Sequence, residues 1–433
     1  DAGEGSRNYV VFDEDAITIE NILAANREFP VRKLVDVEIY GELALDGSLR
    51  AVPGLLPSVI KARDAERSVI VPESNAAEAA LAGAVVYPAA SLRDVIDHLA
   101  GRSALEPGAT EDVSRPLPVL SDLIDVKGQQ FAKRALEVAA AGSHNLLLVG
   151  PPGTGKSMLA RRLPGILPMM SEEEALETAS VCSVANAAVS VETWRATPFR
   201  APHHTASAAA LVGGGRVLSP GEISRAHNGV LFMDELPEFN RTVLEALREP
   251  LETGVIRLAR AGMHADFPAR FQLVAAMNPC PCGYLGDEKS DCRCSRDRVV
   301  AYRNKVSGPL LDRIDLHVEV LRPPTAALRH GDCDAEDSAT VAKRVKAARK
   351  VQLQRQGAAN ARLEGKALSR YCRPGDAGWA LLENAADRFN LSARSQQRIL
   401  RVARTVADLA ARDSIEPPHI AEALSLRCLD RRM

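Results

Sequence analysis

The stretch that decides the fold reads Gly150-Pro151-Pro152-Gly153-Thr154-Gly155-Lys156-Ser157. It follows an apolar run at residues 146–149 and precedes a helix-like segment at 158–163, so a strand, a glycine-rich loop and a helix succeed one another. In such a loop the glycines let backbone N–H groups point at phosphates, Lys156 brings a positive charge to the β- and γ-phosphates, and Ser157 offers a hydroxyl to Mg²⁺. The eight residues therefore predict a nucleoside triphosphate site, because a chance glycine-rich turn would lack this context.

A second apolar run ends in two carboxylates. Residues 230–233 lead directly into Asp234 and Glu235. At the carboxyl end of a buried parallel strand, Asp234 would hold Mg²⁺ through water, and Glu235 would orient and deprotonate the attacking water. Carboxylates often follow strands for no catalytic reason, but a position about 80 residues after the phosphate loop makes the pair a strong candidate.

Two further polar positions complete the predicted site. Residues 271–277 form another apolar run and lead into Asn278, whose side chain can fix the attacking water beside the γ-phosphate. Arg313 lies between a helix-like segment and the next apolar run, where it is a candidate finger that neutralises charge in a neighbouring subunit's transition state. The alternative for Arg313 is a structural salt bridge to Asp312 or Asp315.

The C-terminal part of the chain reads as helical. Beyond residue 335 its clearest apolar stripe consists of Leu391, Ile399, Val402, Val406 and Leu409. Arg394 lies at the start of a helix predicted at 392–410, from which it could reach the phosphates; the alternative is a solvated residue at a helix start. The candidate catalytic residues are therefore Glu235, Asn278, Arg313 and Arg394.

Composition along the chain predicts an α/β fold in four parts. Residues 1–100 alternate short strand-like and helix-like stretches and form a small α+β domain, and residues 101–118, with several Gly and Pro, form a linker. Residues 119–324 alternate short apolar runs with helical patterns, which predicts a parallel sheet covered by helices. Residues 325–433 form a helical lid.

The whole chain has the composition of an ordinary soluble globular protein. Its 433 residues are 46% hydrophobic and 25% charged, and no stretch approaches the ~18 consecutive apolar residues of a membrane span. Because its start has no leader-like segment, we expect a cytoplasmic protein without a membrane partner. The formal charge of −2, from 54 Lys and Arg against 56 Asp and Glu, argues against DNA binding through bulk positive charge.

Four of the eight cysteines lie close together, as Cys280-Pro281-Cys282 and, after nine intervening residues, Cys292-Arg293-Cys294. In a reducing compartment such a cluster more often binds metal than forms disulfides. Four-cysteine zinc sites more often have two residues within each pair, so the spacing suggests structural Zn²⁺ without being diagnostic. Reduced thiols and a redox pair are the alternatives.

The phosphate loop is followed along the chain by Asp234-Glu235, Asn278, Arg313 and Arg394. Motifs in this sequence order resemble those of an AAA+ ATPase. The surrounding sequence resembles, more narrowly, the magnesium-chelatase-like ATPases of the YifB/ComM type, from about residue 35 to the end. The stretches that carry this likeness are Asp125-Val126-Lys127-Gly128-Gln129, Phe199-Arg200-Ala201-Pro202-His203-His204, Leu211-Val212-Gly213-Gly214-Gly215, Pro220-Gly221-Glu222-Ile223 and Ser307-Gly308-Pro309-Leu310-Leu311-Asp312-Arg313-Ile314-Asp315. The resemblance implies a homo-oligomeric ring, usually a hexamer, with ATP and Mg²⁺ at the subunit interfaces, and kinship with the MCM helicases.

The resemblance also implies two insertions that face the pore of the ring, at residues 195–220 and 255–270. The first contains His203-His204, an adjacent pair that cannot share a helix face, so the interpretations are packing or capping within the insertion, or contact with a substrate in the pore. The insertion at 255–270 resembles a hairpin and carries Arg257 and Arg260. Whether Arg394 acts on the ATP of its own subunit or of its neighbour is left open.

The N-terminal unit is similar to the Lon-protease-like domain of this family, through residues 41–47, 53–55 and 71–75. In Lon proteases a catalytic Lys follows the Gly-Leu pair within three residues, whereas this chain has Leu56-Pro57-Ser58 there. A Ser–Lys peptidase is therefore disfavoured. Residues 1–30 match the family poorly, so we expect this domain to be truncated.

Two functions fit the resemblance. The first is a DNA motor of the ComM type, for branch migration or helicase activity in recombination or natural transformation, and the second is a chelatase-like ATPase that remodels a protein. Charge favours DNA, because residues 343–433 hold 19 Lys and Arg against 9 Asp and Glu, a balance of +10 that leaves −12 for the rest. The alternative is that this charge faces ATP or solvates the lid.

Overall fold

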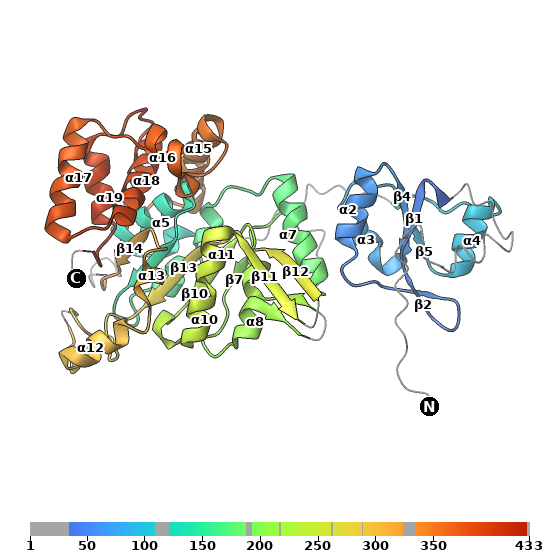
Figure 1. Ribbon diagram of the computed structural model, residues 1–433, viewed down its shortest axis with the longest axis horizontal. Helices are drawn as coiled ribbons and strands as arrows, with labels where there is room; N and C mark the ends of the chain where they lie inside the picture. Colours follow the sequence, from blue (N-terminus) through green and yellow to red (C-terminus); the bar gives the residue numbers. More distant parts are fainter. Residues whose placement is uncertain are drawn as a thin grey trace. The chain divides into compact units, whose positions relative to one another are not determined.

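The fold comes from a computed structural model, which describes residues 34–108, 121–187, 193–215, 218–260, 263–287, 289–323 and 335–430 (Figure 1). The chain divides into two compact units, one of Asp1–Pro118 with Ser171–Ala196, and one of Val119–Met170 with Thr197–Met433. The boundary at Pro118 is where the sequence predicts one. Residues 1–33, the last ten residues of the predicted linker and the first ten of the predicted lid lie outside the described residues.

The first unit is built on a small parallel sheet with the strand order β1-β4-β5. Its strands are β1 (Val37–Ile39), β2 (Glu42–Leu43), β3 (Leu49–Arg50), β4 (Ser68–Pro72) and β5 (Val86–Ala89), and its helices are α2 (Leu56–Asp64), η2 (Glu73–Asn75), α3 (Ala76–Ala80), α4 (Leu92–Ala100) and α7 (Glu172–Val184). β2 and β3 form a short hairpin. The predicted α+β architecture of this region is confirmed.

Two features of the first unit differ from the sequence prediction. Helix α7 belongs to it, although its residues fall inside the predicted ATPase core, because the Ser183 hydroxyl accepts a hydrogen bond from the Leu56 N–H (3.4 Å). The predicted linker also begins too early. The Gly108 N–H donates to the Val86 carbonyl (2.8 Å) and the Leu105 N–H donates to His98 Nδ1 (2.9 Å), so the described residues after α4 pack on this unit.

The second unit contains a sheet of five parallel strands in the order β14-β6-β13-β10-β7. Its strands are β6 (Leu146–Val149), β7 (Phe199–Arg200), β10 (Val230–Met233), β13 (Gln272–Met277) and β14 (Leu316–Glu319). In chain order the sheet therefore reads 5-1-4-3-2, so the first strand is enclosed on both sides. This arrangement confirms the predicted α/β fold of the AAA+ P-loop type.

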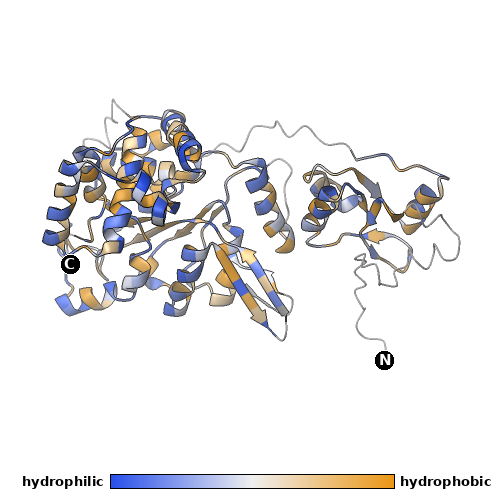
Figure 2. Cartoon of the chain, turned by 45° about the horizontal axis from the view of Figure 1, so that its top comes forward, coloured by the Kyte–Doolittle hydropathy of each residue, from blue (hydrophilic) through white to orange (hydrophobic). Residues whose placement is uncertain are grey.

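Both faces of this sheet are buried, which explains why its strands are continuous apolar runs. Leu146 and Leu148 pack into one hydrophobic cluster, whereas Leu147 and Val149 pack into another on the opposite face. Figure 2 shows that the covering helices carry both hydrophobic and hydrophilic residues, as amphipathic helices do.

Many short elements surround this sheet. They are η3 (Leu123–Asp125), α5 (Gln130–Gly142), α6 (Lys156–Ala160), η4 (Leu163–Ile166), α8 (Ala208–Val212), β8 (Gly213–Gly214), β9 (Ser219–Pro220), α9 (Glu222–Arg225), η5 (Leu236–Glu238), α10 (Arg241–Ala246), α11 (Arg248–Thr253), α12 (Arg296–Arg303) and α13 (Gly308–Leu311). The predicted hairpin is present as β11 (Val255–Arg260) and β12 (Met263–Pro268), which pair in antiparallel register. Its tip at 261–262 lies outside the described residues.

The C-terminal lid consists of α15 (Ser338–Gln356), η6 (Asn360–Arg362), α16 (Gly365–Tyr371), α17 (Asp376–Phe389), α18 (Ala393–Leu409) and α19 (Pro417–Ser425). The Ser392 hydroxyl caps α18 by accepting from the Ser395 N–H (3.1 Å). Ile399, Val402 and Val406 of the predicted stripe are buried in the core that the lid shares with α5 and the sheet. No helix within the described ranges has the length and apolar character needed to cross a membrane.

Candidate nucleotide-binding site

The phosphate loop begins at the end of strand β6 and ends in helix α6. The Gly150 N–H donates to the Met277 carbonyl (3.2 Å), which ties the start of the loop to the end of β13. A side chain at Gly150 would lie 2.2 Å from the Val320 carbonyl oxygen, so only glycine fits. Gly153 and Gly155 have φ angles of 76° and 93°, the left-handed region that glycine adopts without strain. The glycines of the motif therefore allow the close packing and the backbone conformation of the loop.

Lys156 is buried within this loop. Its Nζ donates to the carbonyls of Gly150 (2.7 Å) and Pro151 (2.8 Å) and to Asn278 Oδ1 (3.2 Å). Burial lowers the pKa of Lys156 to about 8, against the opposing effect of the Asp234 and Glu235 carboxylates. The negative charge of a triphosphate would restore the ammonium form, because an adjacent opposite charge favours the charged state.

Ser157 and Asp234 lie in direct contact, since the Ser157 hydroxyl donates to Asp234 Oδ2 (2.6 Å). Hydroxyl and carboxylate oxygens are ligands that Mg²⁺ accepts, often together with phosphate oxygens and water. The loop of Gly150, Pro151, Pro152, Gly153, Thr154 and Gly155, with Lys156, Ser157 and Asp234, thus has the donor set that a Mg²⁺–nucleotide complex requires.

Glu235 follows β10 in an unusual backbone conformation. Its φ of 54° and ψ of 48° place it in the left-handed region, which non-glycine residues adopt at a cost and which is found often at active sites. The Glu235 N–H donates to Asp234 Oδ1 (3.0 Å), and its side chain is 53% exposed. The carboxylate of Glu235 is therefore accessible to a water molecule, as its predicted role requires.

Two residues make contacts near this site that the sequence analysis did not predict. His204 Nδ1 lies 3.6 Å from Glu235 Oε2, so the structure brings the histidine pair of the first insertion to the predicted base. Gln129 Nε2 donates to the carbonyls of Thr154 (3.1 Å) and Leu321 (2.5 Å), which braces the phosphate loop. Only the family-like stretch that contains each residue could have indicated them.

Arg313 has a partner that the sequence did not predict. It pairs with the exposed carboxylate of Glu252 and donates to the Pro309 carbonyl (2.6 Å). This pair takes the place of the salt bridge to Asp312 or Asp315 that was the alternative interpretation, and Asp315 instead pairs with Arg398 (2.9 Å). Arg313 therefore forms a structural salt bridge, as the alternative suggested, but its partner is Glu252 and neither Asp312 nor Asp315.

Arg394 lies exposed at the start of α18, as the sequence predicts. Burial lowers the pKa of Arg313, and the positive charges of Arg248, Arg394 and Arg398 lower it further, against the opposing effect of Glu252. Arg394 is thus close enough to Arg313 for their charges to interact. Lys156 is influenced by a different set of charges, because its pKa, which burial lowers, is raised by the carboxylates of Asp234 and Glu235.

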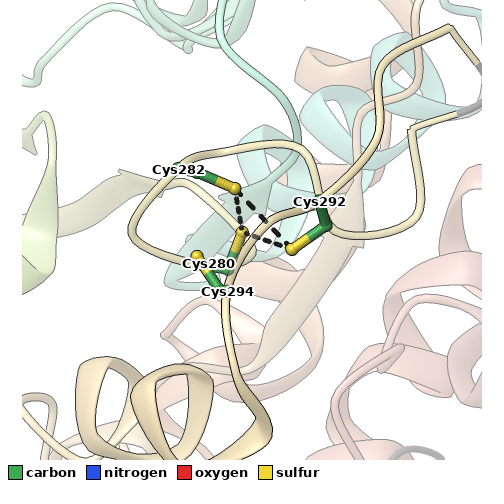
Figure 3. A group of neighbouring side chains, drawn as sticks. All are labelled: Cys280, Cys282, Cys292 and Cys294. Atoms are coloured by element: carbon green, nitrogen blue, oxygen red, sulfur yellow. Dashed lines mark hydrogen bonds between the residues drawn. The ribbon is translucent and has the colours of Figure 1, made fainter.

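The four clustered cysteines lie together in the loop that follows Asn278 (Figure 3). Their sulfur atoms are all within 4.8 Å of one another, and Cys280 is fully buried. Backbone N–H groups of Tyr284 and Arg293 lower the pKa of Cys282 to about 6. The group has the ligand types of a metal site for a soft or borderline ion.

Comparison with known proteins agrees with this geometry. Residues 122–328 match the family of magnesium chelatase subunit ChlI, residues 335–427 match its C-terminal family, and residues 15–75 match a further ChlI family. The chain is 49% identical to the YifB protein of Salmonella typhimurium and 48% identical to the competence protein ComM of Haemophilus influenzae, in each case over 95% of this chain and 81% of the relative. The chain belongs to the YifB/ComM-type magnesium-chelatase-like proteins.

Membership of this AAA+ family makes the chain an ATPase of the chelatase-like type, which uses ATP and Mg²⁺. It is also 30% identical to the magnesium-chelatase 38 kDa subunit of Rhodobacter capsulatus, over 51% of this chain and 60% of that protein. The match from residue 15 corrects one expectation, because it includes part of the segment before Pro30 that we expected to match the family poorly.

Proposed function

We propose that this YifB/ComM-type ATPase hydrolyses ATP at the interfaces of a homo-oligomeric ring of six subunits and uses the energy to move along DNA. The observation that carries the hydrolysis is the convergence of the β6, β10 and β13 strand ends. It brings Lys156 within 3.2 Å of Asn278 and Ser157 within 2.6 Å of Asp234, with Glu235 next in sequence. Lys156 binds the phosphates, Asp234 and Ser157 hold Mg²⁺, Glu235 activates water and Asn278 positions it.

The proposed interface between neighbouring subunits rests on the positively charged residues Arg313, Arg394 and Arg398. Arg313 and Arg394 act on one another electrostatically, and Arg398 joins the lid to Asp315 two residues after Arg313. Arg394 is exposed at the start of α18, whereas Arg313 is buried beside Glu252. We propose that both arginines act on the ATP of the neighbouring subunit, Arg313 after release from Glu252. An arginine supplied in this way stabilises charge in the transition state.

The basic excess of the lid is only partly available for DNA. Many of its arginines hold the fold together, as Arg355 and Arg404 do by pairing with Asp408. Lys343, Lys346 and Lys350, however, lie exposed on α15 at spacings of three and four residues, so they share one face of the helix. This row is the part of the lid that we propose contacts phosphates.

The DNA proposal predicts stimulation of ATP turnover by DNA. We expect forked or single-stranded DNA to raise the rate several-fold at about 50 mM salt and to lose this effect by about 200 mM, since phosphate contacts release counterions. Replacing Lys343, Lys346 and Lys350 together by alanine should lower the slope of log affinity against log salt by about 2 on single strands. Basal ATPase activity should not change.

An unchanged rate and no binding with every DNA structure at low salt would reject DNA as the substrate. In that case the likeness to the magnesium-chelatase 38 kDa subunit would favour the second candidate, an ATPase that remodels a partner protein. A Lys61→Ala variant in α2 of the first unit is the control for general loss of surface charge.

His204 provides a test of the connection between the first insertion and hydrolysis. Because its Nδ1 lies 3.6 Å from Glu235 Oε2, we expect His204→Ala to lower kcat by about 3- to 10-fold with an unchanged KM for ATP, as a positioning residue would. His203 bonds instead to the Thr205 hydroxyl (2.8 Å), so His203→Ala is the matched control. Equal losses in both variants, or a change confined to KM, would contradict this role.

A further inference from the structure

The cysteine cluster has the dimensions of a tetrahedral metal site. The Sγ atom of Cys280 lies 3.4 Å from that of Cys282 and 3.7 Å from that of Cys292, and Cys282 and Cys292 are 3.6 Å apart. A tetrahedron whose centre lies about 2.3 Å from each sulfur, as in zinc–thiolate sites, has edges of about 3.8 Å. The fourth sulfur, of Cys294, lies within the same 4.8 Å limit (Figure 3).

The arrangement fits a metal better than it fits a disulfide. A disulfide would pair two sulfurs at about 2.05 Å and leave the others apart, whereas here each of the three measured distances is similar. The ligands also come from two short segments joined by one loop, so a bound ion would close that loop.

The loop closed by this cluster lies against the nucleotide site. Gly283 follows Cys282 and has a φ of 86°. A side chain at Gly283 would lie 2.7 Å from Pro152 Cδ of the phosphate loop and 3.8 Å from Asn278 Cγ. Cys280 is two residues after Asn278, and the Gly283 N–H donates to the Cys280 carbonyl (3.0 Å). One turn therefore joins the first two cysteines to Gly283, the residue next to Pro152.

Two other contacts anchor the loop on either side of this turn. Arg322 pairs with Asp287 (3.2 Å) and Arg303 donates to the Pro279 carbonyl (3.3 Å). The first contact fixes the middle of the loop and the second fixes its start. The segment between them contains Cys282 and Gly283, the residue next to Pro152.

We propose that Cys280, Cys282, Cys292 and Cys294 bind one zinc ion, and that this ion holds the turn at Gly283 against Pro152 and Asn278, so that loss of the metal slows ATP hydrolysis. The second half of this proposal rests on the ATPase function proposed above. The four thiolates would supply all ligands, which is the composition of a structural site with no open position for catalysis.

The metal site is tested by metal analysis of the purified full chain. We expect about one zinc per chain, reduced to below about 0.2 in Cys282→Ser and Cys294→Ser, and unchanged in Cys182→Ser, whose thiol lies on α7 outside the cluster. Zinc well below one per chain in protein prepared without chelator, with four reactive thiols at the cluster, would overturn the site.

The coupling is tested by glycine variants that keep every cysteine. Gly283→Ala should retain zinc but lower ATP turnover at least about 10-fold, because its methyl group would displace Pro152. Gly286→Ala is the matched control, since Gly286 also has a positive φ (81°) but its added methyl would meet no atom within 4 Å. Chemical release of zinc should lower turnover similarly, and added Zn²⁺ should restore it.

The outcomes separate the two proposals. Full activity after zinc release, or equal effects of the two glycine variants, would overturn the coupling while leaving the ATPase assignment intact. A zinc-loaded wild-type protein without ATP turnover under any condition would refute the ATPase proposal, yet the zinc content would still decide the metal site.

Discussion

Replacing Glu235 by glutamine should leave ATP bound and stop its hydrolysis. Glutamine keeps the size of the side chain and removes the base that accepts a proton from water, so we expect kcat to fall at least about 100-fold. Lys156 and Asp234, which contact the phosphates and Mg²⁺ in the proposed site, are unchanged. Affinity for a fluorescent ATP analogue should therefore stay within about 2-fold of the wild-type value.

Two further variants serve as comparisons for Glu235→Gln. Lys156→Ala should lose nucleotide affinity as well as turnover, because its Nζ is the charge at the centre of the phosphate loop. Glu238→Gln is the matched control for a lost carboxylate, since Glu238 lies three residues further on and forms an exposed pair with Lys305 (3.3 Å). Undiminished turnover in Glu235→Gln would contradict the assignment of the base.

Most of the second unit's sheet could be predicted because burial on both faces leaves a plain signal. Residues 146–149 and 230–233 are predicted as strands and become β6 and β10 with the same bounds. Strand β7 could not be predicted in this way, since it has two residues and pairs only with the start of β10. The place of α7 was also hidden, because it depends on a contact between Leu56 and Ser183, far apart in the chain.

The same distinction applies to the site. Lys156, Ser157 and Asp234 belong to local motifs whose residue types state their chemistry, and the structure brings them together. Glu252 carries no such signal, and His204 is noted only as part of a pair in the first insertion. The contacts of both residues are made by folding, which brings His204 near Glu235 and pairs Glu252 with Arg313. Sequence patterns therefore identify the groups that we propose bind phosphate and Mg²⁺ more readily than the groups that contact them only in the folded protein.

Replacing Arg313 by alanine should abolish turnover in a way that a neighbouring subunit can repair. An arginine finger is worth about 10³- to 10⁵-fold in rate, so we expect at least about a 100-fold loss, measured as steady-state phosphate release. Mixing equal amounts of Arg313→Ala and Lys156→Ala subunits should restore activity, because about a quarter of the interfaces in a random ring would join an intact phosphate loop to an intact finger. Neither variant alone should turn over ATP.

The ion pair between Arg313 and Glu252 offers a second explanation for a loss of turnover in Arg313→Ala. The arginine could act structurally within its own subunit, and this role must be distinguished from that of an arginine finger. Glu252 is 54% exposed, whereas the Arg313 side chain is 9% exposed. Glu252→Gln removes the charge of the partner and keeps a side-chain oxygen that can accept a hydrogen bond from the guanidinium, so the folding stability of this variant is measured alongside its turnover. If Arg313 acts only by holding α11 in place, Glu252→Gln should reproduce the loss of turnover, and mixing with Lys156→Ala should restore nothing. If Arg313 is the finger, Glu252→Gln should retain turnover or raise it, because the guanidinium would no longer be held by its own subunit and could reach its neighbour's phosphates at a smaller cost.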